Sequence, residues 1–180
     1  MTASSHSRRT GFRARLTALC IALCLPATPT AAQSDIEQRD SVQTAAAFAE
    51  KIEAFIAGLP VTRERFEVRI NRCEGARGEL RDDIYAVWVG TRLAAENDDA
   101  GRVLAAVADD WRERNREVFR DRVLDNGGVN IAAFDPASGE SHSLDSGFEP
   151  NPHRDIVGYF STPCFQDFSG AAPFGPVAAE

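Results

Sequence analysis

Two cysteines, Cys73 and Cys164, are the residues best suited to covalent chemistry in the chain after residue 32. In an oxidising compartment, an isolated pair of cysteines in a small domain typically forms one disulfide bond. The alternatives are two free thiols, or one nucleophilic cysteine that acts with a histidine. We expect the disulfide, with Cα atoms about 4.4–6.8 Å apart, joining the ends of the first and last long strands of one sheet.

A second group of reactive residue types lies together at Ser141, His142, Ser143 and Asp145. These are the residue types of a hydrolytic triad. Side chains one position apart on a strand point to opposite faces, however, and the sequence has no Gly-x-Ser-x-Gly turn. We therefore assign no catalytic residue and expect an edge strand in solvent.

The sequence offers no convincing metal or cofactor site. Zinc needs three or four close ligands, which His142 and His153 do not supply at ligand spacing. Oxygen ligands cluster at residues 96–99 and 125–126, but neither cluster has the EF-hand spacing. A helix cap and a tight turn explain these clusters better, and no phosphate-binding or dinucleotide motif is present. We predict neither metal nor cofactor.

Aromatic and basic side chains are the candidates for contact with a partner. Most aromatic residues have the spacing of core positions, but we expect two tyrosines to face away from the helices. Residues 112–122 carry five arginines in an acidic protein. Either neighbouring acidic side chains neutralise these arginines, or the arginines bind an anionic partner. The predicted partner-binding residues are Tyr85, Tyr159, Arg116, Arg120 and Arg122.

The N-terminal segment has the three regions of a secretory signal in order. Four arginines precede an apolar run over residues 16–25, Pro26 ends the run, and small residues follow at 30–32. Ten apolar residues are too few for a permanent membrane helix, which needs about 20. We expect residues 1–32 to be removed near Ala32 and the protein to be secreted, by the general secretory or the twin-arginine route. The alternative is a disordered arm beside a short buried helix.

The net charge of the chain limits the classes of partner that it can bind. Loss of residues 1–32 would change the formal net charge from −7 to −11, because this segment has four arginines and no acidic residue. A chain this acidic is repelled by nucleic acid and by anionic membranes. No other stretch is apolar enough to span a membrane. We expect a single-domain monomer that binds a protein or a cell-envelope component.

Hydrophobic periodicity predicts the elements that position these residues. Helices are expected at residues 42–57 and from Asp98 or Asp99 to residue 111. Strands are expected at 66–73, 84–89, 118–124, 129–134, around 142–144 and at 156–160. Residues 33–41 should be flexible and 166–180 disordered. We predict an α+β two-layer sandwich over residues 42–165, with an antiparallel sheet of four to six strands covered by two helices on one face.

Several short motifs also resemble a known group of proteins: Cys73-Glu74-Gly75, Asp125-Asn126-Gly127-Gly128, Asp135-Pro136-x2-Gly139 and Ser161-x-Pro163-Cys164-Phe165. Over residues 42–165 the chain resembles uncharacterised small exported proteins and lipoproteins of high-GC Gram-positive bacteria. The resemblance implies a disulfide-bonded α+β domain outside the cytoplasm and brings no activity. Many members have a lipobox, which this sequence lacks.

The function expected from the sequence is therefore a non-enzymatic, extracytoplasmic binding domain. One alternative is an extracytoplasmic hydrolase whose carboxylate-based site the sequence does not identify. Another is a structural protein without a ligand.

Overall fold

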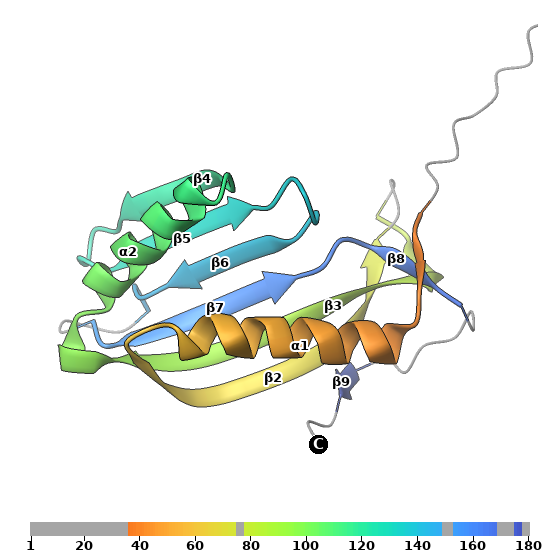
Figure 1. The fold of residues 1–180 in the computed structure, drawn as a ribbon, viewed down its shortest axis with the longest axis horizontal. Helices are drawn as coiled ribbons and strands as arrows, with labels where there is room; N and C mark the ends of the chain where they lie inside the picture. Colours follow the sequence, from red (N-terminus) through yellow and green to blue (C-terminus); the bar gives the residue numbers. More distant parts are fainter. Residues whose placement is uncertain (1–35, 75–77, 149–152, 169–174, 178–180) are drawn as a thin grey trace, which may run out of the picture. The chain divides into compact units, whose positions relative to one another are not determined.

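The computed structural model describes residues 36–74, 78–148, 153–168 and 175–177. The predicted signal segment, residues 1–32, lies outside the described residues. The described part contains two α-helices, one short 3-10 helix and a nine-stranded sheet. Both α-helices cover the same face of the sheet (Figure 1). The α+β class is confirmed, but the sheet has more strands than the four to six predicted. None of the described helices is long and apolar enough to cross a membrane.

Helix α1 (Ser41–Ala57) begins one residue before the predicted start and ends at the predicted residue. The Asp40 side chain accepts a hydrogen bond from the backbone N–H of Gln43 at 2.8 Å, which caps the helix. Phe48, Ile52 and Ile56 recur every four residues and are buried, so they form one stripe. This stripe packs on strands β2 (Val61–Glu74) and β3 (Leu80–Ala95).

Helix α2 (Ala100–Glu113) follows a short 3-10 helix, η1 (Glu96–Asp98). Of the two predicted caps, Asp99 is the one used: its carboxylate accepts a hydrogen bond from the N–H of Arg102 at 3.0 Å. The buried stripe of α2 includes Leu104, Val107 and Trp111. It packs mainly on β4 (Glu117–Val123) and β5 (Val129–Phe134), as Figure 1 shows.

The sheet is antiparallel through its main body. Strands β2 and β3 form a long hairpin, and β3 also pairs with β7 (Asp155–Ser161). From β7 the sheet continues through β6 (Ser141–Asp145) to β5 and β4. The register places Val89, Phe160 and His142 side by side in one row. All three are buried, and they face the helices.

Three further strands of the sheet are short. Strand β1 (Gln38–Arg39) pairs in parallel with β8 (Phe165–Asp167), and β9 (Gly175–Val177) pairs with β2. These strands lie within or next to the segments 33–41 and 166–180, for which flexibility and disorder were predicted. Tertiary contacts hold them in place: for example, the buried Asp167 carboxylate accepts a hydrogen bond from the Ser41 N–H at 2.9 Å.

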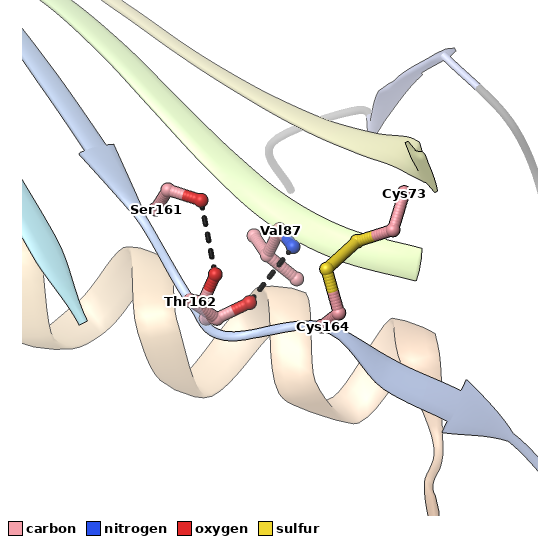
Figure 2. Close-up of a disulfide and its surroundings, with 5 residues drawn as sticks. All are labelled: Cys73, Val87, Ser161, Thr162 and Cys164. Atoms are coloured by element: carbon pink, nitrogen blue, oxygen red, sulfur yellow. Dashed lines mark hydrogen bonds between the residues drawn. A yellow bond between two sulfur atoms is a disulfide. The ribbon is translucent and has the colours of Figure 1, made fainter. Parts of the chain in front are cut away.

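Cys73 and Cys164 are placed as a disulfide pair, with Cα atoms 6.2 Å apart. This agrees with the predicted distance, but the strands that carry them are not neighbours, because β3 lies between β2 and β7. Cys73 lies at an irregularity of the β2–β3 pairing, where the extra residues are those of β3 at 81–84, and Cys164 lies in the link from β7 to β8. Figure 2 shows this link held to β3 as well: the Val87 N–H donates to the Thr162 hydroxyl at 3.0 Å. The bond thus joins two segments across β3.

Candidate functional site

The sheet face opposite the helices carries a set of aromatic and hydroxyl side chains. Alternation along each strand sends these residues away from the helices, because their neighbours in sequence, such as Val89 and Phe160, face the core. The antiparallel register of β3, β7 and β6 then aligns them in rows across the sheet. One row is Trp88, Ser161 and Ser141, and the next is Gly90, Tyr159 and Ser143.

A cleft of about 240 Å³ lies over these rows, and we call it the open-face cleft. Two aromatic side chains, Trp88 and Tyr159, form one wall, and Phe119 and Arg120 of β4 form another. Phe119 is the extra residue of a bulge between Val118 and Arg120, so two consecutive side chains of β4 line the cleft. The remaining lining residues are Ala132, Ser141, His142, Ser143, Phe160 and Ser161. Of these, His142 and Phe160 belong to the row that faces the helices.

The two aromatic rings of the open-face cleft lie close together. The ring centroids of Trp88 and Tyr159 are 5.6 Å apart, with 33° between the ring planes. A Cβ atom added to Gly90 would lie 2.2 Å from Cη2 of Trp88, so the indole lies against the backbone of Gly90. Tyr159 is 48% exposed. The pair therefore presents aromatic surface to solvent on the uncovered face.

Gly90 is the residue that lets Trp88 lie on the sheet, and its replacement tests this geometry. We expect Gly90→Ala to displace the indole, because the added methyl group would overlap the ring. Tryptophan emission should shift to longer wavelength, with a change in the near-UV circular dichroism. Gly101→Ala is the matched control, since a Cβ there meets Val129 at an ordinary 3.7 Å. An unchanged spectrum for Gly90→Ala would contradict the contact.

Polar groups flank the aromatic pair. Arg120 donates a hydrogen bond to the Asn130 side-chain oxygen at 3.2 Å, and the Asn130 amide donates to the Asp145 carboxylate at 2.6 Å. The Arg120 guanidinium also lies 5.8 Å from the centroid of the Phe119 ring. The hydroxyls of Ser141 and Ser143 make no hydrogen bond to another residue in the described ranges. Hydroxyl and guanidinium donors are thus available beside the rings.

The structure brings together only part of the predicted partner-binding set. Tyr159 and Arg120 both line the open-face cleft, and Arg122 is exposed two residues further along β4. Tyr85 corrects the prediction: it faces the helices, is 2% exposed and donates its hydroxyl to the Asp82 carbonyl at 2.7 Å. Arg116 also lies elsewhere, with its side chain only 14% exposed.

Sequence reasoning missed Trp88 and Phe119 as site residues. Trp88 was expected in the core, because residues 84–89 are apolar at every position and the sequence does not mark which face the helices cover. No sequence signal marked the bulge that places both Phe119 and Arg120 at the cleft.

A second concave region lies on the helix side of the sheet, between α1 and α2. This interhelical groove has a volume of about 730 Å³. Its centre is apolar, and the rings of Phe55 and Trp111 stack across it with centroids 6.4 Å apart. The other apolar lining residues include Leu59, Val103 and Val107.

A chain of polar contacts fixes two cations at one end of the interhelical groove. Lys51 donates to both carboxylate oxygens of Glu140, at 2.8 and 2.7 Å. Glu140 contacts His142 Nε2 at 3.3 Å, and His142 Nδ1 lies 2.6 Å from Arg116 Nη1. Arg116 in turn pairs with Asp135 at 3.7 Å. We call these five residues the buried polar chain, and its Lys51 and Arg116 line the groove.

The partners of His142 define its protonation state. Since an arginine can only donate, Nδ1 must accept, which places the proton on Nε2, where it is donated to Glu140. Burial lowers the pKa of His142, the charges of Arg116 and Lys51 lower it further, and Glu140 opposes them only in part. The imidazole is therefore neutral at physiological pH.

Glu140 is held as a carboxylate by its donors. Burial by itself would raise its pKa, but hydrogen bonds from His142 and Lys51, with the charge of Lys51, outweigh burial and lower the pKa to about 2. A general acid at neutral pH needs a raised pKa instead. The buried carboxylate is thus suited to holding Lys51 in place and poorly suited to the hydrolytic alternative. Ser141 and Ser143, on the opposite face from His142, form no triad with it.

Metal binding and similarity to known proteins add no further site. Within the described ranges, no group of three or more His, Cys, Asp or Glu side chains could hold a metal ion. Comparisons with protein-family models, with curated proteins and with solved structures found no match for this chain. The functional assignment therefore rests on the open-face cleft and the interhelical groove.

Proposed function

We propose that this protein is an extracytoplasmic binding domain that holds a cell-envelope polysaccharide in the open-face cleft. The observation that carries the proposal is the pair of half-buried Trp88 and exposed Tyr159. It is flanked by the hydroxyls of Ser141 and Ser143, which have no side-chain partner among the described residues. A pyranose ring has an apolar face of C–H groups and a rim of hydroxyls. The C–H face packs on aromatic rings, and the rim hydrogen-bonds to serine and arginine side chains.

The size of the cleft favours a single sugar ring at its centre. Its volume of about 240 Å³ is below the range of about 300–1,000 Å³ that is usual for sites that enclose a drug-sized ligand. Ala132 leaves this space open at the floor, because its side chain is a single methyl group. The rest of a polysaccharide would run across the uncovered sheet face.

The charges near the cleft favour an uncharged ligand. Asn130 links Arg120 to Asp145, so the positive charge of the arginine has a carboxylate close by. The protein as a whole has a formal net charge of −7, which disfavours nucleic acid and other polyanions. Neither of these charge effects disfavours a neutral or weakly charged glycan.

The proposed location agrees with two features of the chain. Residues 1–32 have the pattern of a secretory signal. Cys73 and Cys164 are placed for a disulfide, which persists in oxidising compartments such as the cell envelope. Both support a ligand that belongs to the envelope.

Sedimentation with purified bacterial peptidoglycan sacculi tests the proposal. We expect Trp88→Ala and Tyr159→Ala each to weaken binding about tenfold, close to 1.4 kcal/mol, within the range of a stacked ring. Phe168→Ala is the matched control: Phe168 is 68% exposed but does not line the cleft. Melting curves of all variants separate lost binding from lost folding.

Two results would overturn the proposal. The first is equal retention of the wild-type protein and Trp88→Ala on sacculi. The second is binding that disappears when the sacculi are treated with protease and persists when their glycan is digested, since this would identify a protein partner instead.

A further inference from the structure

We propose that the interhelical groove is a separate binding site for an amphiphile with an apolar body and a single anionic head, of the fatty-acid type. The groove lies on the helix side of the sheet and the open-face cleft on the other, so this inference does not depend on the proposed function.

The body of the groove fits an apolar ligand. Its volume of about 730 Å³ lies within the range of about 300–1,000 Å³ that is usual for small-molecule sites. Phe55, Leu59 and Val107 line it together with the buried ring of Trp111. An alkyl chain laid along these side chains would remove apolar surface from water, worth about 25 cal/mol per Å².

Unused hydrogen-bond donors define the end that takes the head. The ammonium of Lys51 has three donors, and Glu140 accepts from it twice. The guanidinium of Arg116 has five donors, and its contacts to His142 and Asp135 engage two of its nitrogens. Trp111 Nε1 is buried without a hydrogen-bond partner among the described residues. This end has donors to spare, so it suits a carboxylate or a phosphate.

The buried polar chain makes these cations a prepared site. Glu140 and His142 connect Lys51 of α1 to Arg116, which follows α2, so both cations are held before a ligand arrives. Preorganised donors cost less side-chain entropy on binding than free ones. Lys51 keeps 46% of its side chain exposed and is accessible from solvent.

The opposite end of the groove sets the orientation of the ligand. Glu96 lies there, next to Pro60, whose carbonyl accepts the Glu96 N–H at 3.0 Å. Its carboxylate has no ion-pair partner among the described residues and would repel an anionic head, whereas Glu140 and Asp135 at the other end are paired with Lys51 and Arg116. Asp110, the other acidic lining residue, is paired with Arg114 at 2.9 Å. The head therefore belongs at Lys51 and Arg116, with the alkyl chain toward Leu59.

The two tryptophans allow the site to be observed directly. The chain has two, so Trp88→Phe leaves Trp111 as its single emitter. We expect sodium dodecanoate, titrated below its micelle concentration, to change the emission of this variant saturably. Dodecylamine, which has the same chain and the opposite charge, should bind at least tenfold more weakly. Calorimetry on the wild-type protein supplies a second readout.

Two pairs of variants test the body and the head separately. Ala106→Phe fills the groove and should abolish dodecanoate binding, while Ala105→Phe, at an exposed position outside the lining, should not. Lys51→Gln should weaken dodecanoate roughly 3–10-fold and leave dodecanol unchanged. Lys51→Arg should restore the affinity for dodecanoate.

Equal affinity for dodecanoate and dodecylamine would overturn the proposed head site. Undiminished binding to Ala106→Phe would overturn the groove as the site. If the Trp111 emission depends on protein concentration and light scattering detects dimers, a second copy of the chain occupies the groove. This result would be contrary to the proposal. Trp88→Ala and Tyr159→Ala should leave dodecanoate binding intact, so the two sites can fail independently.

Discussion

Replacing Cys73 and Cys164 by serine, or reducing them, should lower the free energy of unfolding by about 2–5 kcal/mol. The two cysteines are 91 residues apart. In the chain-entropy model, a loop of this length gives about 4–5 kcal/mol through restriction of the unfolded chain. For a domain of this size, the melting temperature should fall by roughly 5–15 °C. Thermal unfolding followed by circular dichroism, with and without reductant, measures the change.

The double serine variant is also the control for the reductant. Reductant should lower the melting temperature of the wild-type protein and leave that of the variant unchanged. A non-reduced tryptic digest should contain the two cysteine peptides joined. Free thiols in the native protein, or a melting temperature that reductant does not change, would contradict the bond and leave two thiols whose reactivity would need a separate explanation.

Local signals made the main elements predictable. Asp99 caps a helix because its side chain competes for backbone N–H groups. The turn at residues 125–128 needs a glycine with positive φ, which Gly127 supplies at +87°. In both cases, residues close in sequence determine the structure. The existence of both helices and the positions of the longer strands along the chain therefore followed from the sequence.

The short strands were not predictable, because other parts of the chain hold them in place. Strand β1 has two residues and no pattern of its own, and it exists because β8 pairs with it. Strand β9 contains Pro176, which is tolerated because β9 pairs with a single neighbour, β2. Cys73 and Cys164 were predicted to bond, but the position of β3 between their strands depends on tertiary pairing.

Only part of the candidate site was predicted from the sequence, and the reason is physical. Residues 84–89 are apolar on both faces, so alternation along the strand does not reveal which face the helices cover. Tyr85 and Trp88 were consequently assigned to the wrong faces. Tyr159 and Arg120 were identified correctly as surface residues, since charge and exposure can be inferred locally. Residues from α1, from β6 and from the segment after α2 meet in the buried polar chain, which only the fold reveals.

Acid should destabilise the protein in a way that depends on Glu140. The pKa of Glu140 is about 2 in the folded state against an ordinary 4.5. Above pH 4.5, Glu140 is ionised in both the folded and the unfolded protein, and its contribution to the free energy of unfolding is complete. As pH falls from 4.5 toward 2, the unfolded chain takes up a proton that the folded protein does not, so stability is lost. The difference corresponds to about 3 kcal/mol. Urea unfolding at a series of pH values measures it.

His142 should add to this acid sensitivity at higher pH. Its pKa is lowered from 6.5, chiefly by burial, so the unfolded chain protonates first as pH falls through that value. Stability from the neutral imidazole is present above about pH 6.5 and is lost below it. The loss of stability should therefore begin before the pH range in which Glu140 contributes.

Glu140→Gln separates this carboxylate from all others. At neutral pH the variant should be less stable by about 1–3 kcal/mol, because Lys51 loses its charged partner. Between about pH 5 and pH 3, however, the variant should lose less stability than the wild-type protein, since one proton-binding difference has been removed. Glu53→Gln, an exposed partner of Arg63, is the control and should keep the wild-type slope. If the wild-type protein and Glu140→Gln lose equal free energy over this range, Glu140 is not held ionised by Lys51 and His142. The preorganisation of the interhelical groove would then lose its basis.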